Sequence, residues 1–195
     1  KSKQILSFSP ECFLGNQNGL LTAKPMKGTL ATKGFSSSDL QNDKKNQAEN
    51  LMIVDLLRND MSKISEIGTV KVPNLFEVQK VGEVFQMTST IKSTLKKGIN
   101  LSQLLEATFP CGSVTGAPKK KTMEIISILE NEPRESYCGS IGWFDPKKTD
   151  NYLGNFMMGV SIRTIELIDN HDLTFGVGSG ITIDSNNFEE WKECL

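Results

Sequence analysis

The chain has no marked excess of charge and no long apolar run. Its 195 residues include 22 lysines and arginines against 23 aspartates and glutamates, with no basic block longer than Lys119–Lys121. A nucleic-acid surface needs clustered positive charge, so we expect no DNA or RNA partner. No stretch approaches the roughly 20 apolar residues that span a bilayer, and the first residues do not resemble a signal peptide. The composition therefore predicts a soluble, cytoplasmic protein with no membrane partner.

Cysteine and histidine are also scarce. Cys12, Cys111, Cys138 and Cys194 form no C-x-x-C pair, which argues against both a zinc site and a disulfide framework. We expect reduced and mostly packed thiols. The single histidine, His171, lies in a polar turn that is expected to face solvent.

Strand-like segments dominate both ends of the chain, and helical segments lie between them. This order predicts an α+β fold with antiparallel β-sheets flanked by helices. Strands are expected at 5–8, 69–73, 83–91, 137–144, 155–167 and 173–183, and helices at 44–59, at 100–107, after 116 and from 186. The polar, turn-rich segment 34–47 is expected to be a mobile loop.

Two of the expected helices carry apolar stripes at helical spacing. Such a stripe usually faces the core. The first is formed by Ala48, Leu51, Met52, Asp55 and Leu56, and the second by Met123, Ile126 and Leu129.

Two short glycine-containing segments are candidates for binding or chemistry. In Pro25–Thr29 a lysine, Lys27, precedes Gly28, and its amine is a possible nucleophile, although turn lysines are usually solvated surface charges. The segment Gly176–Gly180 has alternating glycines but lacks the G-x-G-x-x-G spacing, and a strand rather than a helix is expected after it. A dinucleotide loop is therefore disfavoured, which leaves a glycine bend or a site where backbone N–H groups approach a carboxylate.

Several charged residues have both a structural and a functional interpretation. Arg163, in a strand-like segment, needs an anionic partner, either a structural aspartate or a ligand carboxylate. Glu190 and Glu193 can share one face of the last helix, and Glu49 lies on the first long helix. Exposed helix glutamates are usually solvated, whereas clustered ones can bind a hard cation.

Four blocks appear in a characteristic order along the chain. They are Ala48–Asp60, Phe109–Lys119 with the sequence FPCGSVTGAPK, Tyr137–Gly142 and Gly176–Gly180. Together they resemble the chorismate-utilising enzymes, a family that includes anthranilate, isochorismate, salicylate and aminodeoxychorismate synthases. The resemblance implies paired sheets flanked by helices. It also implies that residues 1–195 are the C-terminal part of a chorismate-binding catalytic domain whose upstream part is absent.

The resemblance implies a set of substrate contacts. Arg163 and Tyr137 would hold a chorismate carboxylate, and backbone groups of Gly178 and Gly180 would approach the substrate. Gly28, Thr29 and Ser113 also match substrate-binding positions, although each hydroxyl could equally serve a turn or a helix cap.

The resemblance further implies an acid and a metal. Glu11 matches the general acid that protonates the departing C4 hydroxyl of chorismate. Glu49, Glu190 and Glu193 match the glutamates that hold Mg²⁺. Asn46 stands where many relatives have an acid, so we expect a weaker magnesium site.

Lys27 distinguishes between members of the family. Enzymes that add water or free ammonia at C2 have a small residue here, whereas aminodeoxychorismate synthases have a lysine that attacks C2. Gln86 also stands where many relatives have a histidine. The expected activity is Mg²⁺-dependent amination of chorismate at C4, on the route to 4-aminobenzoate and folate, with ammonia from a glutamine amidotransferase subunit or fused domain. The alternatives are anthranilate synthase component I and an inactive fragment that retains only the binding residues.

Overall fold

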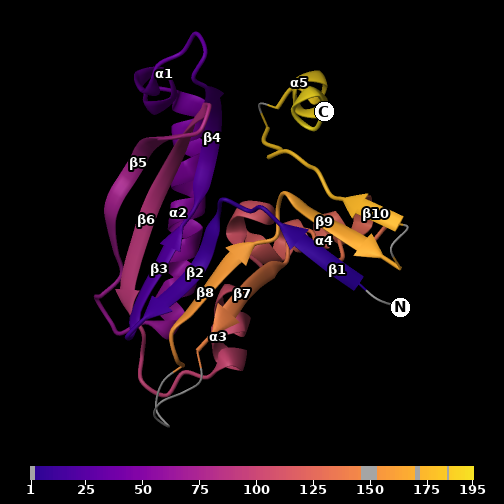
Figure 1. Ribbon diagram of the computed structural model, residues 1–195. Helices are drawn as coiled ribbons and strands as arrows, with labels where there is room; N and C mark the ends of the chain where they lie inside the picture. The colour runs from indigo at the N-terminus through magenta and orange to yellow at the C-terminus, as the bar shows by residue number, and fades with distance from the viewer. Residues whose placement is uncertain (1–2, 146–152, 170–171, 184) are drawn as a thin grey trace.

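The chain forms two antiparallel sheets with helices packed mainly against the larger one (Figure 1). The computed structural model describes residues 3–145, 153–169, 172–183 and 185–195. Within this part, the larger sheet has seven strands in the order β4-β6-β3-β2-β8-β7, with β5 also paired to β6, and the smaller sheet has the order β1-β9-β10. The α+β fold with antiparallel sheets is therefore confirmed.

The strand bounds explain how the sheets are connected. The seven-stranded sheet contains β2 (Cys12–Gln17), β3 (Leu20–Lys24), β4 (Met26–Ala31), β5 (Lys71–Val81), β6 (Val84–Thr94), β7 (Ser140–Phe144) and β8 (Phe156–Val160). The three-stranded sheet contains β1 (Lys3–Ser7), β9 (Thr164–Ile168) and β10 (Asp172–Phe175). The chain crosses between the sheets twice, from β1 to β2 and from β8 to β9.

The helices are α1 (Ser37–Gln41), α2 (Lys44–Ile64), α3 (Leu101–Thr108), the 3-10 turn η1 (Gly112–Val114), α4 (Lys119–Leu129) and α5 (Asn187–Glu193). Several of them, though not α4 or η1, begin after a residue whose side chain accepts a free backbone N–H group. Asp43 accepts the backbone N–H of Asn46 at the start of α2, and Asn100 accepts that of Gln103 at the start of α3. No helix in the described part of the chain is long and apolar enough to cross a membrane.

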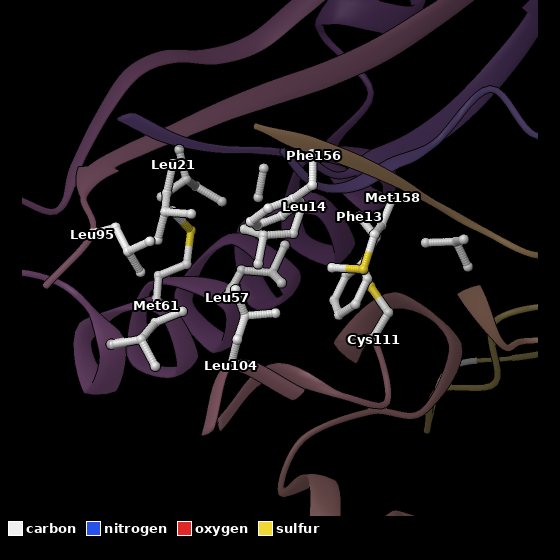
Figure 2. Packing of buried hydrophobic residues seen from close by; sticks show 14 of the residues in the cluster. Phe13, Leu14, Leu21, Leu57, Met61, Leu95, Leu104, Cys111, Phe156 and Met158 are labelled. Atoms are coloured by element: carbon white, nitrogen blue, oxygen red, sulfur yellow. The ribbon is translucent and has the colours of Figure 1, made fainter. Parts of the chain in front are cut away.

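The core lies between the seven-stranded sheet and helices α2 and α3. Figure 2 shows Leu57 and Met61 of α2 and Leu104 of α3 beneath side chains from β2, β3 and β8. All three of these helical residues are buried, as are the facing Phe13 and Phe156. The buried residues of α2 and α3 therefore cover this face of the sheet.

The expected core face of α2 is wrong. The buried residues are instead Asn50, Ile53, Val54, Leu57, Asp60, Met61 and Ile64, whereas Leu51 and Met52 are more than 40% exposed. The buried row contains two polar residues, which weakens its apolar pattern. Asn50 accepts a hydrogen bond from Ser89 Oγ at 2.5 Å, and Asp60 forms ion pairs. Buried polar groups with partners are tolerated, and a hydrophobic count does not detect them.

The stripe on α4 is not part of this core either. None of its residues is buried, and Met123 and Leu129 are 42% and 72% exposed. The segment 34–47 differs as well, because it contains α1, whose first turn is capped reciprocally by Ser36 and Asp39.

Three strand predictions also need correction. The segment 155–167 is broken between β8 and β9, where Arg163 has a φ of 49°. The segment 137–144 begins as a turn and becomes a strand at Ser140. Only Asp172–Phe175 is a strand in the last segment, because the glycines that follow pack on Tyr137 instead of extending the sheet. His171 and nearly all of the polar segment 145–150 lie outside the described residues.

We predict that Leu57→Ala lowers the free energy of unfolding by about 2–5 kcal/mol, because it leaves a cavity under the sheet. Leu51→Ala is the matched control on the same helix, and its 43% exposed side chain should cost less than about 1 kcal/mol. Urea denaturation of both variants measures the difference. Equal losses, or a larger loss for Leu51→Ala, would contradict the observed core face.

Candidate active site

Glu11 is a buried carboxyl at the junction between the two sheets. Glu11 is 5% exposed, and its Oε1 has no hydrogen-bond partner among the described residues. Burial raises the pKa of Glu11 to about 7, although a hydrogen bond from the Ser113 side chain and the positive charge of Lys27 act in the opposite direction. A carboxyl with this pKa carries its proton in a substantial fraction of molecules at neutral pH and can donate it.

Lys27 directs its amine into the same site. It lies on β4 and is half-buried. A Cβ at Gly180 would lie 3.3 Å from Lys27 Nζ and 3.7 Å from Glu49 Oε2. The glycine therefore leaves room for both polar groups, and the site gathers Glu11, Lys27, Glu49 and Gly180 from four separate segments.

Ser113 reaches the site on the loop between α3 and α4. A Cβ at Gly112 would lie 2.5 Å from Leu56 Cδ2, so the loop packs on α2 more closely than any side chain would permit. Ser113 Oγ lies 3.2 Å from Cys111 Sγ, and burial raises the pKa of the Cys111 thiol to about 12. The thiol is therefore neutral and packed, as the sequence predicts.

Tyr137 forms the next part of the site. A Cβ at Gly178 would lie 2.9 Å from Tyr137 Oη, and Gly176 packs against the ring. Burial raises the pKa of Tyr137 to about 12, so the phenol is a neutral hydrogen-bond donor at physiological pH. The predicted neighbours Tyr137 and Gly178 are brought together.

Three predicted substrate residues lie in other surroundings. Thr29 is exposed on β4, opposite Gln86 of β6. Gly28 has a φ of +85°, and a Cβ there would lie 2.9 Å from Asn46 and Leu40, so its observed role is to let α1 and α2 approach β4. Arg163 is exposed at the break between β8 and β9, and none of the ion pairs found in the described part of the chain includes it.

The three predicted metal ligands are not gathered in this structure. Glu190 is buried, and its carboxylate lies 3.7 Å from Lys45 Nζ. Hydrogen bonds from Ser185 and Ser179, together with Lys45, lower the pKa of Glu190. Glu193 is exposed. Within the described residues no group of three or more acidic, cysteine or histidine side chains could hold a metal ion.

The oxygen donors still suit Mg²⁺ chemically, because it binds one or two carboxylates and keeps several waters. Glu49 and Glu190 come from helices at the same end of the molecule, and the Lys45–Glu190 ion pair joins α5 to the first turn of α2. The amide nitrogen of Asn46 donates to Asp43 at 3.0 Å.

Two further residues support the site and were not found from the sequence. Asp60 and Lys119 form a buried ion pair between α2 and the start of α4. Both lie in the blocks that resemble the family, but no periodicity relates two residues 59 positions apart. The signal available in the sequence was their opposite charge, because an acidic residue that is buried on a helix needs a cationic partner.

Comparison with known proteins decides the family. The model for chorismate binding enzymes matches residues 1–195. The chain belongs to this family. It is 42% identical to aminodeoxychorismate synthase component 1 of Escherichia coli over 98% of its length, and 42% identical over 98% to the chloroplastic aminodeoxychorismate synthase of Arabidopsis thaliana.

A solved structure agrees with this assignment. The crystal structure of anthranilate synthase component I from Streptococcus pneumoniae superposes with a TM-score of 0.85 and 35% identity over 98% of this chain. The chain covers 42% of that structure, 42% of the E. coli protein and 21% of the Arabidopsis protein. It therefore spans less than half the length of these relatives.

We predict that Glu11→Gln becomes more stable relative to the unsubstituted protein as pH rises. Burial raises the pKa of Glu11 from 4.5 to about 7, so the folded state binds more protons between these values and loses stability as pH increases. Glutamine removes this effect, which should give the variant a relative gain of roughly 3 kcal/mol at pH 8 over pH 4. Denaturation across this pH range measures the difference.

Glu166→Gln provides a control of opposite sign. A hydrogen bond from Lys3 lowers the pKa of Glu166, so that carboxylate stabilises the fold above its unfolded pKa and the stabilisation is lost as pH falls. A difference between Glu11→Gln and the unsubstituted protein that does not change with pH would contradict a protonated Glu11.

Proposed function

We propose that the complete protein is component I of an aminodeoxychorismate synthase, which aminates chorismate at C4. The observation that carries this proposal is that the Lys27 amine shares a site with the buried carboxyl of Glu11, whose pKa burial raises to about 7. A nucleophile and a general acid in one site are what substitution of a hydroxyl group requires. The names of the E. coli and Arabidopsis relatives support the same activity.

In this proposal Lys27 forms a covalent intermediate. The neutral amine attacks C2, the ring double bonds shift, and the C4 hydroxyl takes the proton of Glu11 and leaves as water. Ammonia then adds at C4, the double bonds shift back, and the C2–nitrogen bond to Lys27 breaks to release the neutral amine. One proton of the new C4 ammonium group returns to the Glu11 carboxylate. Two displacements replace one direct substitution at C4.

The substrate would be anchored by groups around this pair. The neutral hydroxyl of Tyr137 and the adjacent backbone of Gly178 supply donors for a carboxylate. The Ser113 hydroxyl hydrogen-bonds to Glu11 and would contact the substrate at the same place. Arg163 is exposed here and would have to turn toward the substrate to pair with it.

Mg²⁺ would be held by Glu49, Glu190 and Glu193, and when bound it would neutralise a substrate carboxylate. Binding requires Glu190 to exchange Lys45 for the metal and requires α5 to bring Glu193 closer to Glu49. Lys27 and Glu11 are not among these three glutamates, so they remain available as the nucleophile and the acid.

The proposal includes a glutamine amidotransferase, as a subunit or a fused domain, that supplies the ammonia. The word component in the E. coli name supports a second component, and the greater length of the Arabidopsis relative leaves room for a fused one. The product would then serve 4-aminobenzoate and folate synthesis. Anthranilate synthase is the alternative, supported by the S. pneumoniae structure, but it provides no role for an amine at position 27.

We also propose that residues 1–195 form the C-terminal part of a longer catalytic domain. Their relatives are more than twice as long, and the chain exposes many large apolar side chains on α4, β10 and α5, among them Ile128, Leu173 and Trp191. Further parts of the domain would cover these side chains.

Lys27→Ala in the complete protein should reduce formation of the 4-amino product roughly a hundredfold or more, because the nucleophile is lost. Chorismate binding should persist, since Tyr137 and Gly178 are unchanged. Chromatography of the products with glutamine as donor measures the loss. Lys33→Ala, an exposed lysine just after β4, is the control and should act normally. Undiminished 4-amino product from Lys27→Ala would refute the covalent route.

Removal of single carboxylates should weaken Mg²⁺ binding. Glu49→Gln and Glu193→Gln should each lower the affinity at least about tenfold, because a ligand charge is lost, while melting changes little at these incompletely buried positions. Titration calorimetry with Mg²⁺ and no substrate measures this. Glu189→Gln, also exposed on α5, is the control. Unchanged affinity in both ligand variants would rule out the assigned ligands.

A further inference from the structure

A single lysine closes both ends of the loop that carries Ser113. The loop runs from Phe109 to Pro118, between the end of α3 at Thr108 and the start of α4 at Lys119. Lys119 Nζ donates to the carbonyl oxygen of Thr108 at 2.9 Å and lies 2.5 Å from Asp60 Oδ2 on α2. The first residue of α4 is thereby tied to the last residue of α3, and both are tied to α2.

The pair is buried at Asp60 and partly exposed at Lys119, and both oxygens of Asp60 take part in ion pairs. The side chain of Asp60 is 4% exposed and that of Lys119 is 16% exposed. The second oxygen of Asp60 accepts from Lys63 Nζ at 2.9 Å, but Lys63 is 52% exposed and has no ion pair with the described loop residues. About one turn earlier on α2, Leu56 packs on Gly112. The loop therefore has two contacts with α2, one apolar and one ionic.

A buried ion pair seldom stabilises a fold more than apolar residues of the same shape would, whereas its geometry is strict. This pair supports the loop that places the Ser113 hydroxyl at the Glu11 carboxyl, to which it hydrogen-bonds. Thr115 Oγ1 also closes the loop on itself by donating to the carbonyl of Cys111 at 2.9 Å, so a displacement at Lys119 would move Ser113 with the rest of the turn.

We propose that Asp60 and Lys119 are positioning residues, whose ion pair holds the loop 109–118 on α2 so that the Ser113 hydroxyl stays on the Glu11 carboxyl. The role of Glu11 as an acid rests on the proposed function, but the contact itself does not. The groups that face Glu11 are Ser113 and Cys111 from the loop, Lys27 from β4 and the neighbouring Cys12. Only the two loop residues should move when the pair is broken.

The test uses three variants of the two lysines that form ion pairs with Asp60. Lys119→Met removes the amine and keeps an unbranched stem, and Lys119→Arg restores a charged donor. Lys63→Met is the matched control, because it removes the other ion-pair partner of Asp60, which has no ion pair with the described loop residues. Each is compared by amide hydrogen exchange of residues 111–117 and by carboxyl ¹³C NMR titration of glutamate-labelled protein, with the Glu11 signal identified from Glu11→Gln.

In Lys119→Met the amides of the loop should exchange at least about tenfold faster, and the Glu11 titration should move to higher pH because the Ser113 hydrogen bond is lost. Lys119→Arg should restore most of both properties, and Lys63→Met should change neither. In the complete enzyme, the pH at which kcat declines should move in the same direction, with little change in KM.

A folded Lys119→Met protein with unchanged exchange and an unchanged Glu11 titration would overturn the proposal, as would equal effects from Lys63→Met. If Lys119→Met does not fold, Asp60→Asn is judged by the same two criteria. Neither NMR nor exchange depends on turnover. A protein that shows the predicted shifts but does not aminate chorismate would therefore refute the proposed function and leave the positioning role standing.

Discussion

Packing of α2 against the seven-stranded sheet is the constraint on which the site depends. The helix buries Leu57 and Met61 beneath β2, β3 and β8 and thereby fixes every residue on its other sides. Glu49, near its start, faces the site beside Gly180. Leu56 and Asp60, farther along, receive the loop that carries Ser113. A shift of this helix would therefore alter the candidate ligand, the loop and the core together.

The proposed chemistry depends on placing an acid in a buried position. Glu11 lies at the crossing from β1 to β2, where the two sheets meet and where its Oε1 has no partner within the described structure. Lys27 and Ser113 partly offset the cost of charging it. Because Lys27 and Ser113 only partly offset the effect of burial, the pKa of Glu11 is raised to about 7, and the carboxyl can either hold or release a proton. A fully paired carboxylate would be a better structural element but a poor acid.

The sequence predicts the fold class and most elements, because strand and helix periodicities are local. It also predicts that Glu11, Lys27, Ser113 and Gly180 share a site, through their resemblance to family motifs. It misplaces the core face of α2, where Asn50 and Asp60 are buried with partners that periodicity cannot identify. It also extends the last strand through Gly176–Gly180, where tertiary packing on Tyr137 overrides β-propensity. The exposed stripe of α4 retains its apolar pattern but has no covering element in the described residues.

The metal site is where sequence and structure are least alike. The family motifs place Glu49, Glu190 and Glu193 together, whereas Lys45 pairs with Glu190 and Glu193 remains exposed. An ammonium group and a hard cation can compete for the same carboxylate. Motif resemblance identifies the residue types, but it does not specify which cation the carboxylates face.

Peptide mapping by mass spectrometry tests the central claim most directly. The complete protein would be incubated with chorismate and Mg²⁺ in the absence of an ammonia source, then quenched and digested. A covalent role for Lys27 predicts that the peptide containing it gains the mass of chorismate less one water, and that no such gain occurs without chorismate. An unmodified Lys27 peptide throughout the incubation, or the same gain on another lysine, would contradict the account.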